Sequence, residues 1–215
     1  MKIGVYWGCT IKTLEYAYER SLRETFKRLG VELEDLKEDF CCGAPVKHIS
    51  LTAAVYLGIR VLAIAKSQGL NTLLVPCNGC HLSIFEAKHF IKENKEIKEK
   101  VAVALEKEGL EIPNGIRVFH TIDFLHDELG LKKIKESIVK ELKGLKFACH
   151  PGCHLIRPRK LERPDSPENP VKLDELVKAL GAETIDYPEK LDCCGASILN
   201  RYPEATLSLA GQKLL

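Results

Sequence analysis

Apolar positions along this chain alternate between the spacing of a buried strand and the spacing of a helix. Short apolar runs over residues 3–6 and 72–75 predict two buried strands, and residues 31–36 alternate apolar and acidic side chains, as a half-buried strand does. Over 14–29, apolar residues recur every three or four positions, which predicts a helix. Residues 50–65 predict another, with a serine N-cap, that is central because nearly every face is apolar.

The remaining chain continues this alternation. Helix patterns follow residue 81 and cover residues 91–107, 134–142, 173–180 and 203–215. Strand patterns cover residues 117–120, 146–149 and 183–186. Asn169 and Pro170, at the end of an irregular loop, are a suitable N-cap and first residue for the helix that Gly181 closes. Strands that alternate with helices predict an α/β fold with parallel sheets.

Cysteines are placed in a pattern that repeats along the chain. Of the nine, eight fall into two sets, Cys9, Cys41, Cys42, Cys77 and Cys80, then Cys153, Cys193 and Cys194. Each group follows a predicted strand, and open α/β sheets place their sites at the carboxyl ends of strands. The ninth, Cys149, lies outside the repeat and is expected to be a small buried core residue.

The number and spacing of these thiols indicate a metal centre. Thiolates are preferred ligands of iron and zinc. Adjacent side chains such as Cys41 and Cys42 normally point apart, which suits a large inorganic core better than a single ion. Five thiols also exceed the four ligands of a tetrahedral ion or an ordinary cubane. A zinc site that uses four of the five is the structural alternative. Gly43 and Gly195, which follow the doublets, are expected to let the backbone approach the inorganic core.

Composition narrows the functional class. The 215 residues are 45% apolar and 29% charged, with a net charge of +2, so neither disorder nor a nucleic-acid partner is expected. The longest apolar segment, residues 51–65, carries an arginine and is too short for a transmembrane segment. No signal peptide pattern begins the chain, so a cytoplasmic, reducing location is expected. There, patterned cysteines are more often metal ligands than disulfides.

The cysteine spacing resembles that of a known family. The pattern Cys-x31-Cys-Cys-Gly-x33-Cys-x2-Cys of the first set is similar to the CCG domain. The second half resembles the B subunit of heterodisulfide reductase in four segments, residues 150–155, 167–170, 173–177 and 186–188. The resemblance covers the entire chain, and both motifs occur in order.

This resemblance implies two tandem Rossmann-like CCG units related by internal duplication, residues 1–145 and 146–215. It implies two noncubane 4Fe–4S clusters, the first held by Cys9, Cys41, Cys42, Cys77 and Cys80. Cys153, Cys193 and Cys194 would supply three ligands to the second, whose other ligands would lie beyond Leu215, so the second unit is expected to be incomplete at its C-terminus. In the family, the clusters reduce a disulfide (CoM-S-S-CoB in methanogens) to two thiols. Electrons come from the flavin-containing A subunit through the cubane clusters of the C subunit.

Other residues and functions remain open at this point. His81 and His154 follow cluster cysteines and are candidate proton donors, or simply packing residues. Nearby cations could bind acidic groups of a coenzyme or serve only solubility: Lys47, His48, Arg157, Arg159 and Lys160. One alternative function is an electron-transfer component of another oxidoreductase, for sulfur oxidation or for succinate, glycolate or lactate. A zinc-containing structural module is the other.

Overall fold

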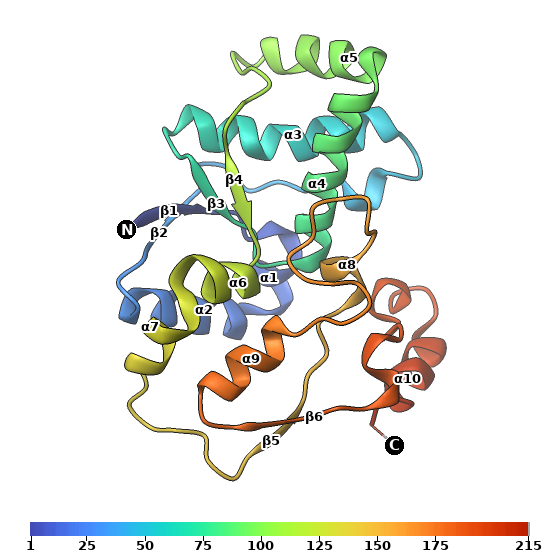
Figure 1. Ribbon diagram of the computed structural model, residues 1–215. Coiled ribbons are helices and arrows are strands. Elements are labelled where there is room, and N and C mark those ends of the chain that lie inside the picture. The colour runs from blue at the N-terminus through green and yellow to red at the C-terminus, as the bar shows by residue number, and fades with distance from the viewer. Residues whose placement is uncertain (215) are drawn as a thin grey trace. The chain divides into compact units, whose positions relative to one another are not determined.

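The computed structural model describes residues 1–214 and contains two compact units (Figure 1). The first unit is Met1–Phe124, and the second begins at Leu125. The boundary that the cysteine motifs predict, between residues 145 and 146, stays a prediction. In the described part of the chain, no helix is long and apolar enough to cross a membrane.

A four-stranded parallel sheet organises the first unit. Its strands are β1 (Lys2–Val5), β2 (Glu32–Asp35), β3 (Thr72–Leu74) and β4 (Arg117–Phe119), in the order β2-β1-β3-β4. Val5 lies opposite Asp35 on one side and Leu74 on the other. The four strands predicted from the sequence are therefore confirmed. Since all pairs are parallel, the strands end at one edge of the sheet.

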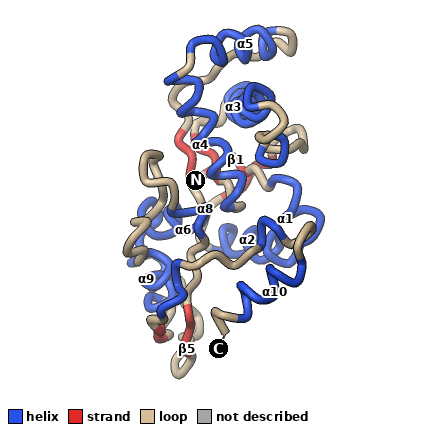
Figure 2. The backbone as a smooth tube through the Cα atoms, turned by 90° about the vertical axis from the view of Figure 1, so that its right-hand side faces the viewer, coloured by secondary structure: helices blue, strands red, loops and turns tan. Residues whose placement is uncertain are grey.

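Helices cover both faces of this sheet. They are α1 (Gly8–Leu14), α2 (Tyr16–Arg28), α3 (Leu51–Ser67), α4 (Asn78–Glu93), α5 (Lys95–Glu106) and α6 (Thr121–Asp123). The strands, red in Figure 2, lie between α3 and α2. On the α2 side, Phe26 is fully buried and stacks on Phe124, with 5.4 Å between ring centroids.

Helix α3 is the central helix that its sequence predicts. Most of its residues are buried, and the Ser50 side chain accepts a hydrogen bond from the Ala53 amide at 3.2 Å, as an N-cap does. Gly58 lets α3 approach α4 closely, since a Cβ added there would lie 2.7 Å from the Ala87 Cβ. The two helices that flank the first cysteine loops are thus held in tight contact.

The second unit contains a two-stranded parallel sheet of β5 (Lys146–Ala148) and β6 (Glu183–Ile185). Its helices are α7 (Leu131–Glu136), α8 (Cys153–Ile156), α9 (Lys172–Ala179) and α10 (Pro203–Gly211). The chain also contains a π-helix, η2 (Phe124–Gly130), which begins at the last residue of the first unit. Three short 3₁₀ helices are η1 (Ala44–Val46) in the first unit and η3 (Pro188–Leu191) and η4 (Ala196–Ile198) in the second. Helix α10 confirms the last predicted helix. Leu215, the end of the predicted range, lies outside the described residues.

Three helix predictions differ from the structure. The helix expected over 14–29 is interrupted at Glu15, whose φ of −117° and ψ of 37° separate α1 from α2. The helix expected over 91–107 begins only at Lys95, after the N-cap Asn94 that ends α4. The helix expected over 134–142 stops at Glu136, because the chain turns so that the Leu142 amide donates to the Leu180 carbonyl.

The start of α9 also differs from its prediction. The helix begins at Lys172 rather than at Pro170. Its first amides, those of Val171 and Lys172, donate to the Asp165 carboxylate at 2.8 and 2.7 Å. A side chain from the preceding loop therefore satisfies the donors that the predicted Asn169 cap would have satisfied.

Candidate functional site

The first cysteine set is assembled by three neighbouring strands. Cys9 lies in the first turn of α1 after β1, Cys41 and Cys42 follow β2, and Cys77 is the N-cap of α4 after β3. Because β2, β1 and β3 are adjacent and parallel, their carboxyl ends meet at one sheet edge. Helix α4 begins four residues earlier than predicted, which places Cys80 in its first turn rather than in a preceding loop.

The thiols of this set lie close together. The Cys80 thiol is hydrogen-bonded to the thiols of both Cys42 and Cys77. A Cβ added to Gly8 would lie only 2.6 Å from the Cys80 Sγ, so the glycine lets the Cys9 segment pass against it. The charges of Cys9 and Cys42 also act on the Cys41 thiol. The structure therefore brings together all five residues that the sequence selects.

Two of these thiols are poised to ionise near neutral pH. The hydrogen bond from Cys80 lowers the pKa of Cys77 to about 6, with help from the amides of Gly79 and Cys80 at the start of α4. The same donor lowers the pKa of Cys42 to about 7. The hydrogen bonds with Cys42 and Cys77, together with burial, raise the pKa of Cys80. Since the thiolate is the form that binds metals, the set is preorganised for that role.

The two Cys-Cys-Gly loops have the same local geometry. Gly43 and Gly195 adopt positive φ angles of 91° and 75°, and each is followed by a short 3₁₀ turn. Their amides donate to the Sγ of Cys41 at 3.4 Å and of Cys193 at 3.3 Å. Each loop thus turns its glycine amide back onto the first thiol of its own doublet.

The glycines of these loops pack closely against the helix that follows each loop. A Cβ on Gly43 would lie 2.5 Å from the carbonyl oxygen of Ala54 in α3. A Cβ on Gly195 would lie 2.9 Å from the Cα of Thr206 in α10. Glycine is therefore required for the positive φ and for packing against the following helix, while the expected approach to an inorganic core stays a prediction.

The second cysteine set is present in part. Cys153 begins α8, and Cys193 and Cys194 precede η4. Burial raises the pKa of Cys153, and the charges of Cys193 and Cys194 raise it further, so the three thiols are near neighbours. Cys193 is exposed, while Cys153 and Cys194 are half-buried. Cys149 is buried, as predicted for a core residue.

The two candidate histidines have different surroundings. His81 is 1% exposed in α4, where its ring stacks on Phe85 at 4.6 Å and meets His120 edge-on at 5.9 Å. His154 is exposed on α8. The imidazole of His81 is therefore enclosed by other side chains, whereas that of His154 is open to solvent. The proton-donor role of both stays a prediction.

Some of the predicted coenzyme-binding cations are paired within the protein. Lys47 donates to Glu86 of α4 at 2.6 Å, which ties the first doublet loop to that helix. Arg159 pairs with Glu168 at 3.2 Å, and Arg157 donates to the carbonyls of Leu191 and Pro167. These contacts give the three cations structural roles.

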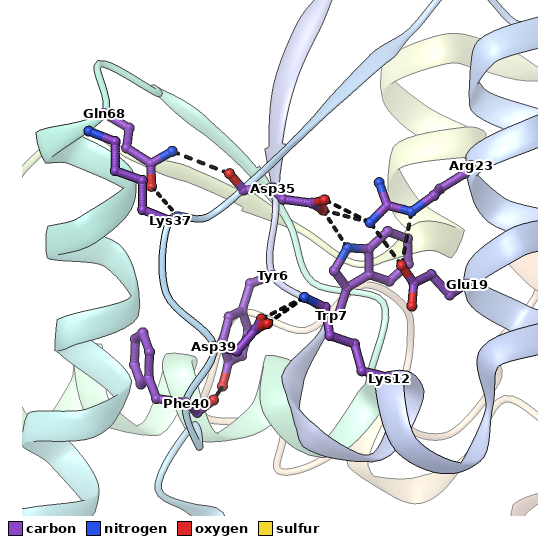
Figure 3. A network of polar contacts seen from close by, with 10 residues as sticks. All are labelled: Tyr6, Trp7, Lys12, Glu19, Arg23, Asp35, Lys37, Asp39, Phe40 and Gln68. Carbon is purple, nitrogen blue, oxygen red and sulfur yellow. Dashed lines mark hydrogen bonds and ion pairs between the residues drawn. The ribbon is translucent and has the colours of Figure 1, made fainter.

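A polar network that sequence reasoning missed connects the Cys9 and Cys41 segments (Figure 3). The Trp7 indole donates to Asp35 at 2.7 Å, and the Arg23 guanidinium, itself bound to Asp35, lies 4.6 Å above the Trp7 ring. Lys12 donates to both oxygens of Asp39. The only signal in the sequence was the position of Trp7 beside Cys9, since the partners are distant in the chain.

The donor set fits a thiolate-bound inorganic group. Five thiols come from three rigid segments, two of them with lowered pKa values, and none of the described cysteines forms a disulfide. Among residues 1–214, no group of three or more His, Cys, Asp or Glu side chains has the arrangement of a site for a single metal ion.

Comparison with known proteins identifies relatives of similar organisation. The chain is 34% identical to the B subunit of ferredoxin:CoB-CoM heterodisulfide reductase from Methanosarcina mazei, over 99% of this chain and 72% of that protein. It is 33% identical to a protein from Archaeoglobus profundus described as similar to the B subunit of heterodisulfide reductase, over 100% and 73%. A more distant relative is the membrane anchor subunit of 8-methylmenaquinol:fumarate reductase from Wolinella succinogenes, with 28% identity over 87% and 65%.

A solved structure and a protein-family model also match this chain. A crystal structure of a hypothetical protein from Helicobacter pylori has a TM-score of 0.64 at 18% identity, over 98% of this chain and 38% of that one, which supports the fold alone. The family model described as a cysteine-rich domain (CCG) matches twice, at residues 3–85 and 147–214. The chain therefore belongs to the CCG cysteine-rich domain family, in the branch that contains the B subunit of heterodisulfide reductase.

Proposed function

We propose that this chain is the disulfide-reducing subunit of a heterodisulfide reductase-type complex. The observation that carries the proposal is the gathering of five thiols from three strand ends, two of them with pKa values lowered to about 6 and about 7. Such a set provides five ligands at a sheet edge for one noncubane 4Fe–4S cluster. The residues are Cys9, Cys41, Cys42, Cys77 and Cys80.

The second set would hold a second cluster through Cys153, Cys193 and Cys194. The shared geometry of the two doublet loops supports this, and it also supports the Rossmann-like duplication of the two units. In this proposal the units act in the cytoplasm, together with the cubane iron–sulfur C subunit and the flavin-containing A subunit of the complex.

The proposed clusters would supply single electrons to the two sulfurs of a coenzyme disulfide such as CoM-S-S-CoB. The protein's own part is to hold the clusters and to deliver protons to the product thiols. The exposed imidazole of His154, next to Cys153, is accessible to solvent protons. His81 is enclosed by Phe85 and His120, which favours a packing role at the start of α4.

Anaerobic metal analysis of the intact chain tests the proposal. Wild-type protein should contain about four iron and four sulfide per complete cluster, and a thiol such as coenzyme M should induce an EPR signal in the oxidised state. Cys42→Ser should remove most of this iron, whereas Cys149→Ser, a matched change of a buried cysteine outside the sets, should retain it. One zinc with little iron, in protein never exposed to air, would contradict the proposal and favour a structural module.

A second candidate function is electron transfer within a different oxidoreductase. The more distant relatives favour it, since they include a lactate utilization protein and one component of a fumarate reductase. In that case the protein would bind the cluster, but added thiol would leave the EPR spectrum unchanged and no disulfide would be reduced. The thiol-induced signal therefore separates the two functions.

A further inference from the structure

We infer that Tyr6 and Ser83 are positioning residues that fix the Cys41–Cys42 doublet through two buried hydroxyl groups. This inference rests on the proposed function in that it assigns these hydroxyls a role in shaping the cluster site. Neither residue belongs to a cysteine motif. They reach the doublet from different elements, Tyr6 from the residue after β1 and Ser83 from α4.

Tyr6 restrains the residue just before the doublet. Its hydroxyl donates to the Phe40 carbonyl at 2.7 Å, and its ring lies 5.9 Å from the Phe40 ring (Figure 3). Arg60 packs over the same phenyl ring, 4.5 Å from its centroid. Tyr6 is 3% exposed, and burial together with the surrounding thiols raises its pKa, so the hydroxyl stays protonated and can donate.

Ser83 restrains the second residue of the doublet. It lies one helical turn after Cys80 and is 7% exposed. Its Oγ donates to the Cys42 carbonyl at 2.8 Å. The helix that carries two cysteines of the set therefore holds the loop that carries two others.

Together the two hydroxyls restrain the peptide groups on both sides of Cys41–Cys42. Adjacent side chains normally point apart, so both thiols can face one inorganic group only if the backbone between them bends in a defined way. Two hydrogen bonds to the carbonyls of Phe40 and Cys42 set that bend. In the second unit, a helical hydroxyl again holds the doublet loop, since the Thr206 Oγ1 donates to the Gly195 carbonyl at 3.0 Å.

Thiol labelling of the metal-free full chain tests the inference directly. We expect Tyr6→Phe and Ser83→Ala each to raise the iodoacetamide labelling rate of Cys41 and Cys42 about fivefold, the effect of losing one hydrogen bond worth about 1 kcal/mol. Peptide mass spectrometry resolves these rates from those of Cys193 and Cys194, which should stay unchanged. Ser83→Thr, which keeps the hydroxyl, should restore the wild-type rate.

Matched variants control for the loss of a hydroxyl elsewhere. Tyr187→Phe removes a similar hydrogen bond, from a tyrosine hydroxyl to the Cys149 carbonyl at 3.2 Å in the second unit. Ser67→Ala removes a part-buried helical serine bond to the Ile64 carbonyl. Both should leave the labelling of the first doublet at the wild-type rate.

Cluster-loaded protein gives a second readout that a purely structural role would not change. Ser83→Ala and Tyr6→Phe should shift the EPR g-values of the first cluster, and Ser83→Thr should return them toward wild type. Unchanged labelling of the first doublet in both variants would overturn the inference, as would an equal rise at all cysteines, which reports global unfolding. Wild-type protein that takes up no cluster would refute the proposed function, while the labelling rates would still decide the positioning role.

Discussion

Replacing Gly43 by alanine tests why the first doublet loop needs glycine. Gly43 has a φ of 91°, and an added Cβ would lie 2.5 Å from the carbonyl oxygen and 2.9 Å from the Cα of Ala54. The left-handed conformation costs a non-glycine residue about 1–2 kcal/mol. Overlap with the backbone of a packed helix adds about 1–3 kcal/mol. We therefore expect Gly43→Ala to lower the free energy of unfolding by about 2–5 kcal/mol.

A matched control separates the two contributions. Gly69, just after α3, has a φ of 77° but nothing within 4 Å of an added Cβ. Gly69→Ala should therefore show the conformational cost alone, about 1–2 kcal/mol. Urea denaturation of both variants, followed by circular dichroism, measures the difference, and each kcal/mol should lower Tm by about 2–4 °C in a chain of this size. Equal destabilisation of the two variants would refute the packing argument for Gly43.

Three further predictions follow from individual contacts. Ser50→Ala should destabilise the protein by about 1 kcal/mol in urea denaturation, because it removes the N-cap of α3; no change in midpoint would contradict that role. Burial opposes ionisation of His126, but hydrogen bonds, chiefly with Glu175, raise its pKa above 6.5. The contribution of protonated His126 to the free energy of unfolding should be complete below pH 6.5 and should disappear as pH rises through the raised pKa. His126→Gln should lack this decline when unfolding is measured as a function of pH. Asp35→Ala should shift the fluorescence of Trp7, the single tryptophan, to the blue, because the buried indole N–H loses the carboxylate that stabilises its excited state; an unchanged spectrum would show that the bond is not maintained in solution.

Several features could be predicted because they depend on neighbours in the sequence. Apolar periodicity located the strands of the first sheet and the central helix α3, since burial of one face leaves a local pattern. The N-cap at Ser50 was also predictable, because its partner is the amide three residues later. The repeated cysteine doublets indicated the candidate site for the same reason: the motif is contiguous.

Two helix boundaries differ from those that the local sequence pattern predicts. The Asn169–Pro170 pair was a sound N-cap in isolation, but the Asp165 carboxylate takes the first amides of α9. A continuous apolar repeat hid the break at Glu15, which neither glycine nor proline marks. In the first case a nearby side chain in the loop outcompeted a cap preference worth about 1 kcal/mol. The structure shows no comparable partner that explains the break at Glu15.

The sequence by itself determined which cysteines form the candidate site and that they follow strands. Only the tertiary structure decided how they meet: the order β2-β1-β3 brings three cysteine segments to one edge, and Cys80 shares hydrogen bonds with Cys42 and Cys77. It also decided that Tyr6 and Ser83 hold the doublet and that Gly43 packs on Ala54. The physical reason is that strand pairing, close packing and most of these hydrogen bonds join residues far apart in the chain, which local periodicity does not record.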